Sequence, residues 1–175
     1  FHKLGTNQST DVVVFGDKEK RRYVGGSVSE DNQYLFISAA NSTSGNELYI
    51  KDLTKTNSDI ITISKGFEND VDVIDNIGSK LYIVTNLGAP NKRIVTVDAS
   101  NPSAENWKDL IPETENVLFP STGAGFIFAN YMKDAVSVVK QFDYNGKLIR
   151  EINLPGIGTA SGFGGKMKDK ELYFS

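Results

Sequence analysis

The sequence has no cysteine and a single histidine, His2, among its 175 residues. Without cysteine there is no disulfide framework, no thiol nucleophile and no thiolate metal site, and the compartment, cytoplasmic or periplasmic, stays open. Without a second histidine or a Gly-x-Ser-x-Gly motif, a serine nucleophile has no base beside it. The residues therefore predict no catalytic centre and no cofactor, and His2 is interpreted as structural.

Long apolar runs and basic clusters are also lacking. No apolar stretch approaches the ~18 residues that a membrane-spanning helix needs. The 19 Lys and Arg residues are outnumbered by 22 Asp and Glu residues, which gives a net charge of −3. This balance argues against a surface that binds nucleic acid or an anionic membrane. With 39% hydrophobic and 23% charged residues, the composition is that of an ordinary globular domain.

A repeat of roughly 45 residues runs through the chain. Short apolar runs end in an aspartate 46 and then 45 residues further on, at Asp52, Asp98 and Asp143. A second apolar marker keeps the same spacing, around Leu35, Leu81, Phe126 and Leu172. A period of ~40–50 residues made of short strands and turns is typical of β-propeller blades. The sequence predicts an all-β fold, a β-propeller segment of about four blade equivalents with four antiparallel strands each.

The predicted strands divide residues 1–175 into a half-blade, three blades and a second half-blade. The first half-blade has strands at 1–6 and 11–15, and the last has them within 159–167 and 171–175. An incomplete blade at each end suggests an excised piece of a longer protein. Open half-blades are a liability that proteins seldom leave uncovered. We therefore expect the halves to pair, within one chain as a four-bladed ring or between two chains as a swapped homodimer.

Local chemistry adds four expectations. In KLYIVTN (80–86) both alternating faces are apolar, which predicts a strand between two layers, whereas KLIREINL (147–154) alternates and suits an outer strand. The recurring aspartates are expected to accept hydrogen bonds in the turns that follow them. Asn145-Gly146 predicts a type I′ hairpin turn with two positive φ angles.

Two stretches resemble ligand-binding motifs, and for both a structural interpretation is favoured. GFGGK (162–166) resembles a phosphate loop, but no helix follows it, so its glycines are expected to let a strand approach the propeller axis closely. Asp70, Asp72 and Asp75 offer the carboxylates that calcium prefers, but their spacing is not that of an EF-hand. A solvated rim is the favoured interpretation, and we predict no metal site.

Three motifs occur in the order found in the propeller of prolyl oligopeptidases. FHKLGTNQSTDVVVF (1–15) and RRYVGGSVSEDNQYLFIS (21–38) resemble that family's HxLGT-x-QS-x-D and GG-x-x-S-[DE]-D-x-x-Y stretches. NPSAENWKDLIPE (101–113) is similar to its Pro-x-x-x-x-Trp-Lys-x-Leu-x-Pro-Glu segment. The resemblance runs through essentially the whole chain, so the sequence is identified as part of that propeller.

The resemblance implies a parent that joins a seven-bladed propeller to a catalytic α/β-hydrolase domain with a Ser/Asp/His triad. Such an enzyme is a serine protease that cleaves proline-containing peptides after proline, and its propeller admits short peptides while excluding folded proteins. The triad lies outside this chain, which alone should be inactive. The family pattern places substrate-binding residues at Val24, before Gly25-Gly26, and near Thr43, in a loop one residue shorter than the family's.

Two other functions fit a propeller without those motifs. One is a free-standing module that binds peptides or proteins and has no hydrolase attached. The other is a lectin-like or structural repeat protein. A serine elbow of the Gly-x-Ser-x-Gly-Gly type downstream in the same gene would identify the peptidase, and its absence would leave the binding module.

Overall fold

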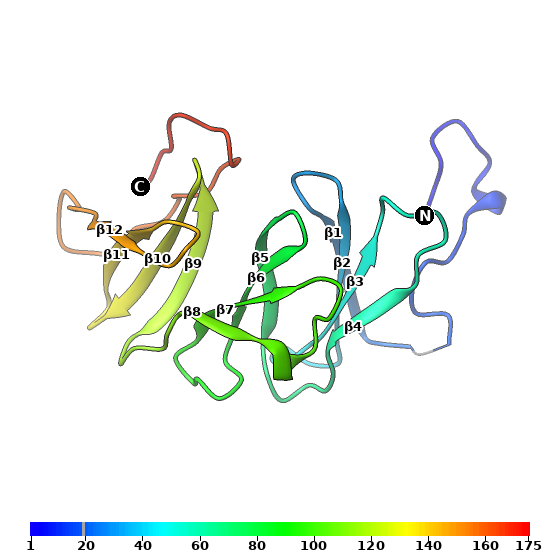
Figure 1. Ribbon diagram of the computed structural model, residues 1–175, viewed down its shortest axis with the longest axis horizontal. Helices are drawn as coiled ribbons and strands as arrows, with labels where there is room; N and C mark the ends of the chain where they lie inside the picture. Colours follow the sequence, from blue (N-terminus) through cyan, green and yellow to red (C-terminus); the bar gives the residue numbers. More distant parts are fainter. Residues whose placement is uncertain (19) are drawn as a thin grey trace.

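The computed structural model describes residues 1–18 and 20–175 and consists of three four-stranded antiparallel sheets placed side by side (Figure 1). The first sheet contains β1 (Tyr23–Val28), β2 (Tyr34–Ala40), β3 (Glu47–Asp52) and β4 (Ile60–Ser64). The second contains β5 (Val71–Ile77), β6 (Lys80–Thr85), β7 (Arg93–Asp98) and β8 (Lys108–Ile111). The third contains β9 (Val117–Gly123), β10 (Phe126–Lys133), β11 (Val136–Phe142) and β12 (Leu148–Glu151).

In each sheet the strands lie in the order in which they follow one another in the sequence. Each sheet is therefore one propeller blade, and the predicted all-β propeller fold is confirmed. The helical elements of the described residues are two 3₁₀ turns, η1 (Gln8–Thr10) and η2 (Ala104–Asn106). None of the helical segments in this part of the chain has the length and apolar character needed to cross a membrane.

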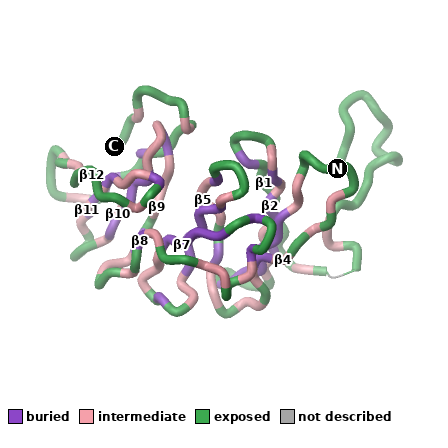
Figure 2. Tube along the Cα trace, in the orientation of Figure 1, coloured by how far each residue is buried: buried purple, intermediate pink, exposed green. Residues whose placement is uncertain are grey.

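The hydrophobic core lies where neighbouring sheets face each other (Figure 2). On β6, Leu81 and Ile83 point to the first sheet, where they join a cluster that includes Ile50. Tyr82, on the opposite face of β6, belongs to the cluster shared with the third sheet, which includes Leu118. The second sheet is thus packed on both faces, as the apolar pattern of residues 80–86 predicted.

The outer strand β12 shows the opposite pattern. All four of its residues are exposed, and Leu148 and Ile149 keep 49% and 46% of their surface in contact with solvent. β12 lies at the edge of the third sheet, where it pairs with β11. The predicted exposed outer strand is confirmed over Leu148–Glu151, whereas Ile152 and Leu154, which follow it, are partly buried against the cluster that contains Phe128.

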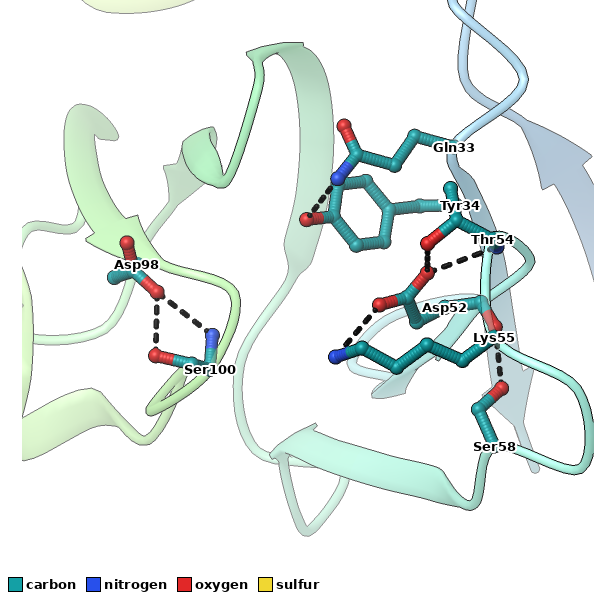
Figure 3. Close-up of polar contacts among 8 residues, drawn as sticks. All are labelled: Gln33, Tyr34, Asp52, Thr54, Lys55, Ser58, Asp98 and Ser100. Atoms are coloured by element: carbon teal, nitrogen blue, oxygen red, sulfur yellow. Dashed lines mark hydrogen bonds and ion pairs between the residues drawn. The ribbon is translucent and has the colours of Figure 1, made fainter.

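The recurring aspartates stabilise the turns that follow the third strand of each blade. Asp52 Oδ1 accepts hydrogen bonds from Thr54 N at 2.9 Å and Thr54 Oγ1 at 2.6 Å, and Asp98 Oδ1 accepts the same pair from Ser100 at 2.8 and 2.6 Å (Figure 3). Asp143 Oδ1 accepts from the backbone N–H groups of residues 145 and 147, both at 2.9 Å. The expected turn role is confirmed in all three blades.

A pH dependence follows for Asp98. Hydrogen bonds from the Ser100 side chain, Ser79 Oγ and the Ser100 backbone lower the pKa of its carboxyl from 3.8 to about 2. A depressed carboxyl pKa stabilises the fold above the unfolded value and loses that contribution as the pH falls through the folded value. Asp98→Asn should therefore lower the urea midpoint at neutral pH, and its difference from wild type should shrink between about pH 4 and pH 2.

Ser100→Ala supplies the control for this titration, because it removes one hydroxyl donor while leaving the carboxylate in place. The pKa of Asp98 should move back toward its ordinary value in that variant. A gap between Asp98→Asn and wild type that stays constant down to about pH 2 would contradict the assignment.

The third-blade hairpin does not adopt the predicted type I′ turn. Gly146 has φ +81°, but Asn145 is not among the residues with positive φ. The Asp143 carboxylate accounts for the difference, because it accepts the N–H groups of Asn145 and Lys147 and holds Asn145 in an ordinary conformation. The ladder shifts register at Gln141/Phe142 to accommodate this longer turn.

The strands predicted at residues 1–6 and 11–15 are also absent from the described structure. The chain turns at Lys3–Thr6, where Gly5 has φ +82°, and enters η1 at once. Phe1 and Val12 still exchange two backbone hydrogen bonds, at 2.7 and 3.2 Å. The turn residues leave too few extended positions for a ladder, so the pairing of these segments stays short.

The C-terminal strands predicted within 159–167 and 171–175 are likewise reduced to an isolated bridge between Gly162 and Phe174. Ser161 and Ser175 exchange two backbone hydrogen bonds at 2.9 and 3.0 Å beside it. The three four-stranded sheets lie between these two ends, and the division of the chain into a half-blade, three blades and a half-blade stays a prediction.

Candidate functional site

Val24 lies on β1, the strand whose six residues are all exposed. Half of its surface is open to solvent, and it pairs with Ala39 of β2. It lines an apolar groove of about 550 Å³, whose other walls are residues 11–15 of the N-terminal segment and the β2 side chains Leu35 and Ile37. Gly25 and Gly26 also line the groove, and Gly26, which pairs with Ile37, lies on the same face of the sheet as Val24.

Thr43 lies in the loop that joins β2 to β3, residues 41–46, and its side chain is exposed. The pairing of Tyr23 with Ala40 places the start of β1 beside the end of β2, so the loop leaves the sheet at the same end as Val24. Asn41 Oδ1 accepts a hydrogen bond from Arg22 N at 3.3 Å and ties the loop to the start of β1. The structure thus brings both predicted residues to one end of the first sheet, although Thr43 does not line the groove.

A second hollow, of about 610 Å³, adjoins the groove and shares Val14 and Phe15 with it. Sequence reasoning did not single out its polar residues. Arg21 Nε donates to Glu47 Oε2 at 2.7 Å, and Tyr49 OH donates to the same oxygen at 2.9 Å. Burial alone would raise the pKa of Glu47, but these two donors lower it.

This fixed ion pair gives the second hollow a different chemistry from the groove. Glu47 is held charged by its donors, and Phe15 packs on Tyr49 with ring centroids 4.8 Å apart. The groove is lined mainly by apolar side chains and glycine, with Asp11 as a charged residue of its lining. The groove is suited to bind an apolar side chain. In the second hollow, the packing of Phe15 on Tyr49 holds the N-terminal segment that forms one wall of the groove.

The other sequence candidates serve structural contacts. His2 Nδ1 lies 2.7 Å from Asp11 Oδ1 on the exposed N-terminal segment. In the glycine-rich stretch, Gly165 N donates to Thr122 O at 3.0 Å, and a Cβ on Gly165 would lie 2.6 Å from Leu172 Cδ2. A Cβ on Gly123 would lie 2.7 Å from Gly165 N. The glycine-rich stretch therefore packs closely against β9 and Leu172, and the approach of a strand to the propeller axis stays a prediction.

Asp70 and Asp75 of the calcium candidate accept hydrogen bonds from different groups, and Asp70 and Asp72 both lie near Lys92. Asp70 accepts a hydrogen bond from Gly45 N and pairs with Lys92, while Asp75 accepts one from Tyr144 OH. Asp72, the second residue of β5, is exposed. Asp70 and Asp75 are thus engaged by protein donors rather than sitting on a purely solvated rim. Within residues 1–18 and 20–175, no group of three or more acidic, histidine or cysteine side chains could hold a metal ion.

All 175 residues match the family model described as prolyl oligopeptidase, N-terminal β-propeller domain. A prolyl endopeptidase from Elizabethkingia meningoseptica is 56% identical over 176 residues, which cover 100% of this chain and 25% of that protein. A prolyl endopeptidase from Elizabethkingia miricola is 54% identical, with the same coverage. The chain spans about a quarter of the length of these relatives.

Solved structures give the same result. One chain, from a structural and mechanistic study of two prolyl endopeptidases, superposes with a TM-score of 0.87 at 30% identity, covering 99% of this chain and 26% of that one. Prolyl oligopeptidase B from Galerina marginata, bound to a 35mer hydrolysis and macrocyclization substrate, superposes with a TM-score of 0.85 at 26% identity, covering 99% and 25%.

Proposed function

Since the chain belongs to the prolyl oligopeptidase family as part of its N-terminal β-propeller domain, we propose that it is the propeller part of a proline-specific serine endopeptidase. In this proposal the propeller gates the access of short peptides to a catalytic α/β-hydrolase domain and contributes residues to the substrate-binding face. The hydrolase supplies the nucleophile, base and oxyanion hole. The partners are thus a proline-containing peptide and that domain.

The observation that carries the proposal is the position of Val24. It is an exposed valine at the edge of an apolar groove, at the end of the sheet where the loop carrying Thr43 emerges. An exposed apolar residue on an apolar groove is suited to contact an apolar group of a peptide, because burying both surfaces is favourable. Val24 and Thr43 are therefore proposed as substrate-binding residues, on the side of the peptide that precedes proline.

The proposed contact is tested by Val24→Asp in the full-length protein. A carboxylate without a partner in an apolar site costs about 1–3 kcal/mol, so KM for a peptide with a large apolar residue before proline should rise roughly 5- to 150-fold. kcat should change little, because Val24 touches no reacting group in this proposal. Steady-state kinetics with a chromogenic peptide series gives both constants.

Val28→Asp is the matched control. Val28 is the same residue type on the same strand, is 52% exposed against 50% for Val24, and lies at the opposite end of β1. The KM of the Val28→Asp variant should stay at the wild-type value. Equal increases in KM for both variants would indicate a general disturbance of β1 and would refute the specific role of Val24.

The free-standing binding module remains the alternative function. The peptidase and the binding module are distinguished by assaying the full-length protein and the isolated chain with a Gly-Pro chromogenic substrate. Turnover by the full-length protein and none by the chain is the expected outcome, because no paired nucleophile and base was predicted in the chain. A full-length protein that binds peptides without hydrolysing them would favour the binding module.

Pairing of the chain's two ends in a homodimer stays a prediction. Light scattering of the isolated chain would test it.

A further inference from the structure

The loop that carries Thr43 is hydrogen-bonded to the start of the second sheet through its last residues, Gly45 and Asn46. Gly45 N donates to Asp70 Oδ1 at 2.9 Å, and Asn46 N donates to Asn69 O at 3.0 Å. The Asn46 side chain pairs with the first residue of β5, accepting from Val71 N at 3.0 Å and donating to Val71 O at 2.8 Å. Loop 41–46 is thus held between two blades rather than by its own hairpin alone.

The contact at Gly45 is close enough to exclude other residues. Gly45 has φ +73°, and a Cβ at this position would overlap the carbonyl group of Phe67. The backbone of the loop therefore presses directly on the segment that precedes β5. Because there is no space between the two, a shift of residues 67–70 would be transmitted to the loop.

Asp70 is the side chain that accepts the N–H of Gly45 at this contact. Its own N–H donates to Asn86 Oδ1 at 2.8 Å, and Lys92 Nζ lies 3.5 Å from its Oδ2. One carboxylate oxygen therefore faces the loop of the first blade and the other faces the equivalent loop of the second blade, residues 86–92. The orientation of Asp70 is set by the second blade, and its Oδ1 presents a fixed acceptor to Gly45.

We infer that Asp70 is a positioning residue for loop 41–46. By fixing this loop, Asp70 holds Thr43 near the end of β1 at which Val24 lies. Asp70 acts on this loop through the N–H of Gly45. This inference rests on the proposed function, because it is there that the loop is assigned to the substrate-binding face. It adds that the geometry of this face depends on a contact between two blades.

The test uses Asp70→Ala and Asp70→Asn in the full-length protein. The side chain of Asp70 is 37% exposed, so neither change opens a cavity in the core. Asp70→Ala removes the acceptor, and amide exchange at residues 45–46 should become about tenfold faster, as expected for the loss of one hydrogen bond. Asp70→Asn keeps a carbonyl oxygen for Gly45 N and should restore slow exchange.

Kinetics supply the second readout. In Asp70→Ala, KM for peptides with residues upstream of proline should rise several-fold with kcat unchanged, and Asp70→Asn should recover most of the loss. Asp109→Ala serves as the control, because this carboxylate pairs with Arg93 at 2.9 Å and lies on β8, at the opposite edge of the sheet from β5. It should alter neither the exchange of residues 45–46 nor KM.

The outcomes separate the two proposals. Unchanged exchange at residues 45–46 in Asp70→Ala overturns the positioning role. Faster exchange with unchanged KM supports the positioning role and overturns the assignment of loop 41–46 to the substrate-binding face. Faster exchange with a raised KM, both reversed in Asp70→Asn, supports both proposals.

Discussion

Replacing Asn46 with alanine is expected to cost about 2–5 kcal/mol of folding free energy, because two buried backbone groups lose their partner at once. The Asn46 amide both accepts from Val71 N and donates to Val71 O, and Val71 is fully buried. Asn46 is itself only 8% exposed, so water has little access to the vacated groups. The loss should appear as faster amide exchange throughout β5 in the full-length protein.

Asn91→Ala is the matched control for this result. Asn91 lies just before β7, as Asn46 lies just before β3, but its side chain donates to Thr114 O at an exposed site. One exposed hydrogen bond is worth about 0.5–1 kcal/mol at most. Equal losses in the two variants would contradict the claim that burial of Val71 makes Asn46 important.

The repeat was readable from the sequence because strand spacing and burial follow directly from residue order. Leu81 and Tyr82 point to opposite faces of one strand, so two apolar faces required two covering layers. The turn role of Asp52 and Asp98 was equally accessible, because both carboxylates bond to a residue two positions further on. These predictions needed only local information.

Contacts between blades were not predictable in this way. The repeat places Asn46, Lys92 and Ser137 at equivalent points, but their side chains contact different groups: Val71 N, the Asp70 carboxylate and Ala160 N. Ser137 uses its hydroxyl to accept from Ala160 N at 2.9 Å, a contact that resembles that of Asn46 with Val71 N. The repeat period identifies which residues occupy equivalent positions. Their hydrogen-bond partners depend on which segment of the neighbouring part of the chain packs against each position.

In the candidate site, too, some residues were predictable from the sequence, and those that act through contacts between distant residues were not. Val24 and Thr43 were selected by resemblance to a family, and strand register explains why they share one end of the sheet. The pair Arg21–Glu47 was missed because its members are 26 residues apart and carry no motif. Asp70 was assigned to a solvated rim in preference to a calcium site, since nothing in the sequence indicates that its carboxylate faces Gly45.

Tyr144 is the second residue at which a large effect is expected. It lies in the turn after β11 and is 8% exposed between the second and third sheets. Its ring meets that of Tyr82 edge-on at 4.9 Å, and its carbonyl accepts from Tyr82 OH at 3.1 Å. Its own hydroxyl donates to Asp75 Oδ2 on β5. The turn of the third blade is thereby anchored to the second.

Tyr144→Ala should cost about 3–5 kcal/mol, because it removes a buried aromatic ring and leaves a cavity between two blades. Tyr144→Phe keeps the ring and removes only the hydroxyl, so it should cost about 1–3 kcal/mol. Urea unfolding of the full-length protein measures both losses. Similar losses in the two variants would mean that the hydrogen bond to Asp75, and not the packing of the ring, fixes this interface.

The pH dependence of Tyr144→Phe identifies the contribution of Asp75. Burial raises the pKa of the Asp75 carboxyl, while the hydrogen bond from Tyr144 acts in the opposite direction. A carboxyl whose folded pKa is raised destabilises the fold at neutral pH, and that cost is relieved as the pH falls through the folded pKa toward the unfolded value. Without the donor the carboxylate is less stable still, so the penalty of Tyr144→Phe should be largest at about pH 7 and should shrink as Asp75 becomes protonated.

Asp75→Asn removes the titrating group and keeps an acceptor for the Tyr144 hydroxyl. In that background the cost of Tyr144→Phe should be the same at all pH values at which the protein folds, because no buried charge depends on the donor. The expected result is thus a pH-dependent gap in the wild-type background and a constant gap in the Asp75→Asn background. A constant gap in both backgrounds would show that Asp75 is not charged at this interface at neutral pH, and that the hydroxyl contributes only an ordinary neutral hydrogen bond.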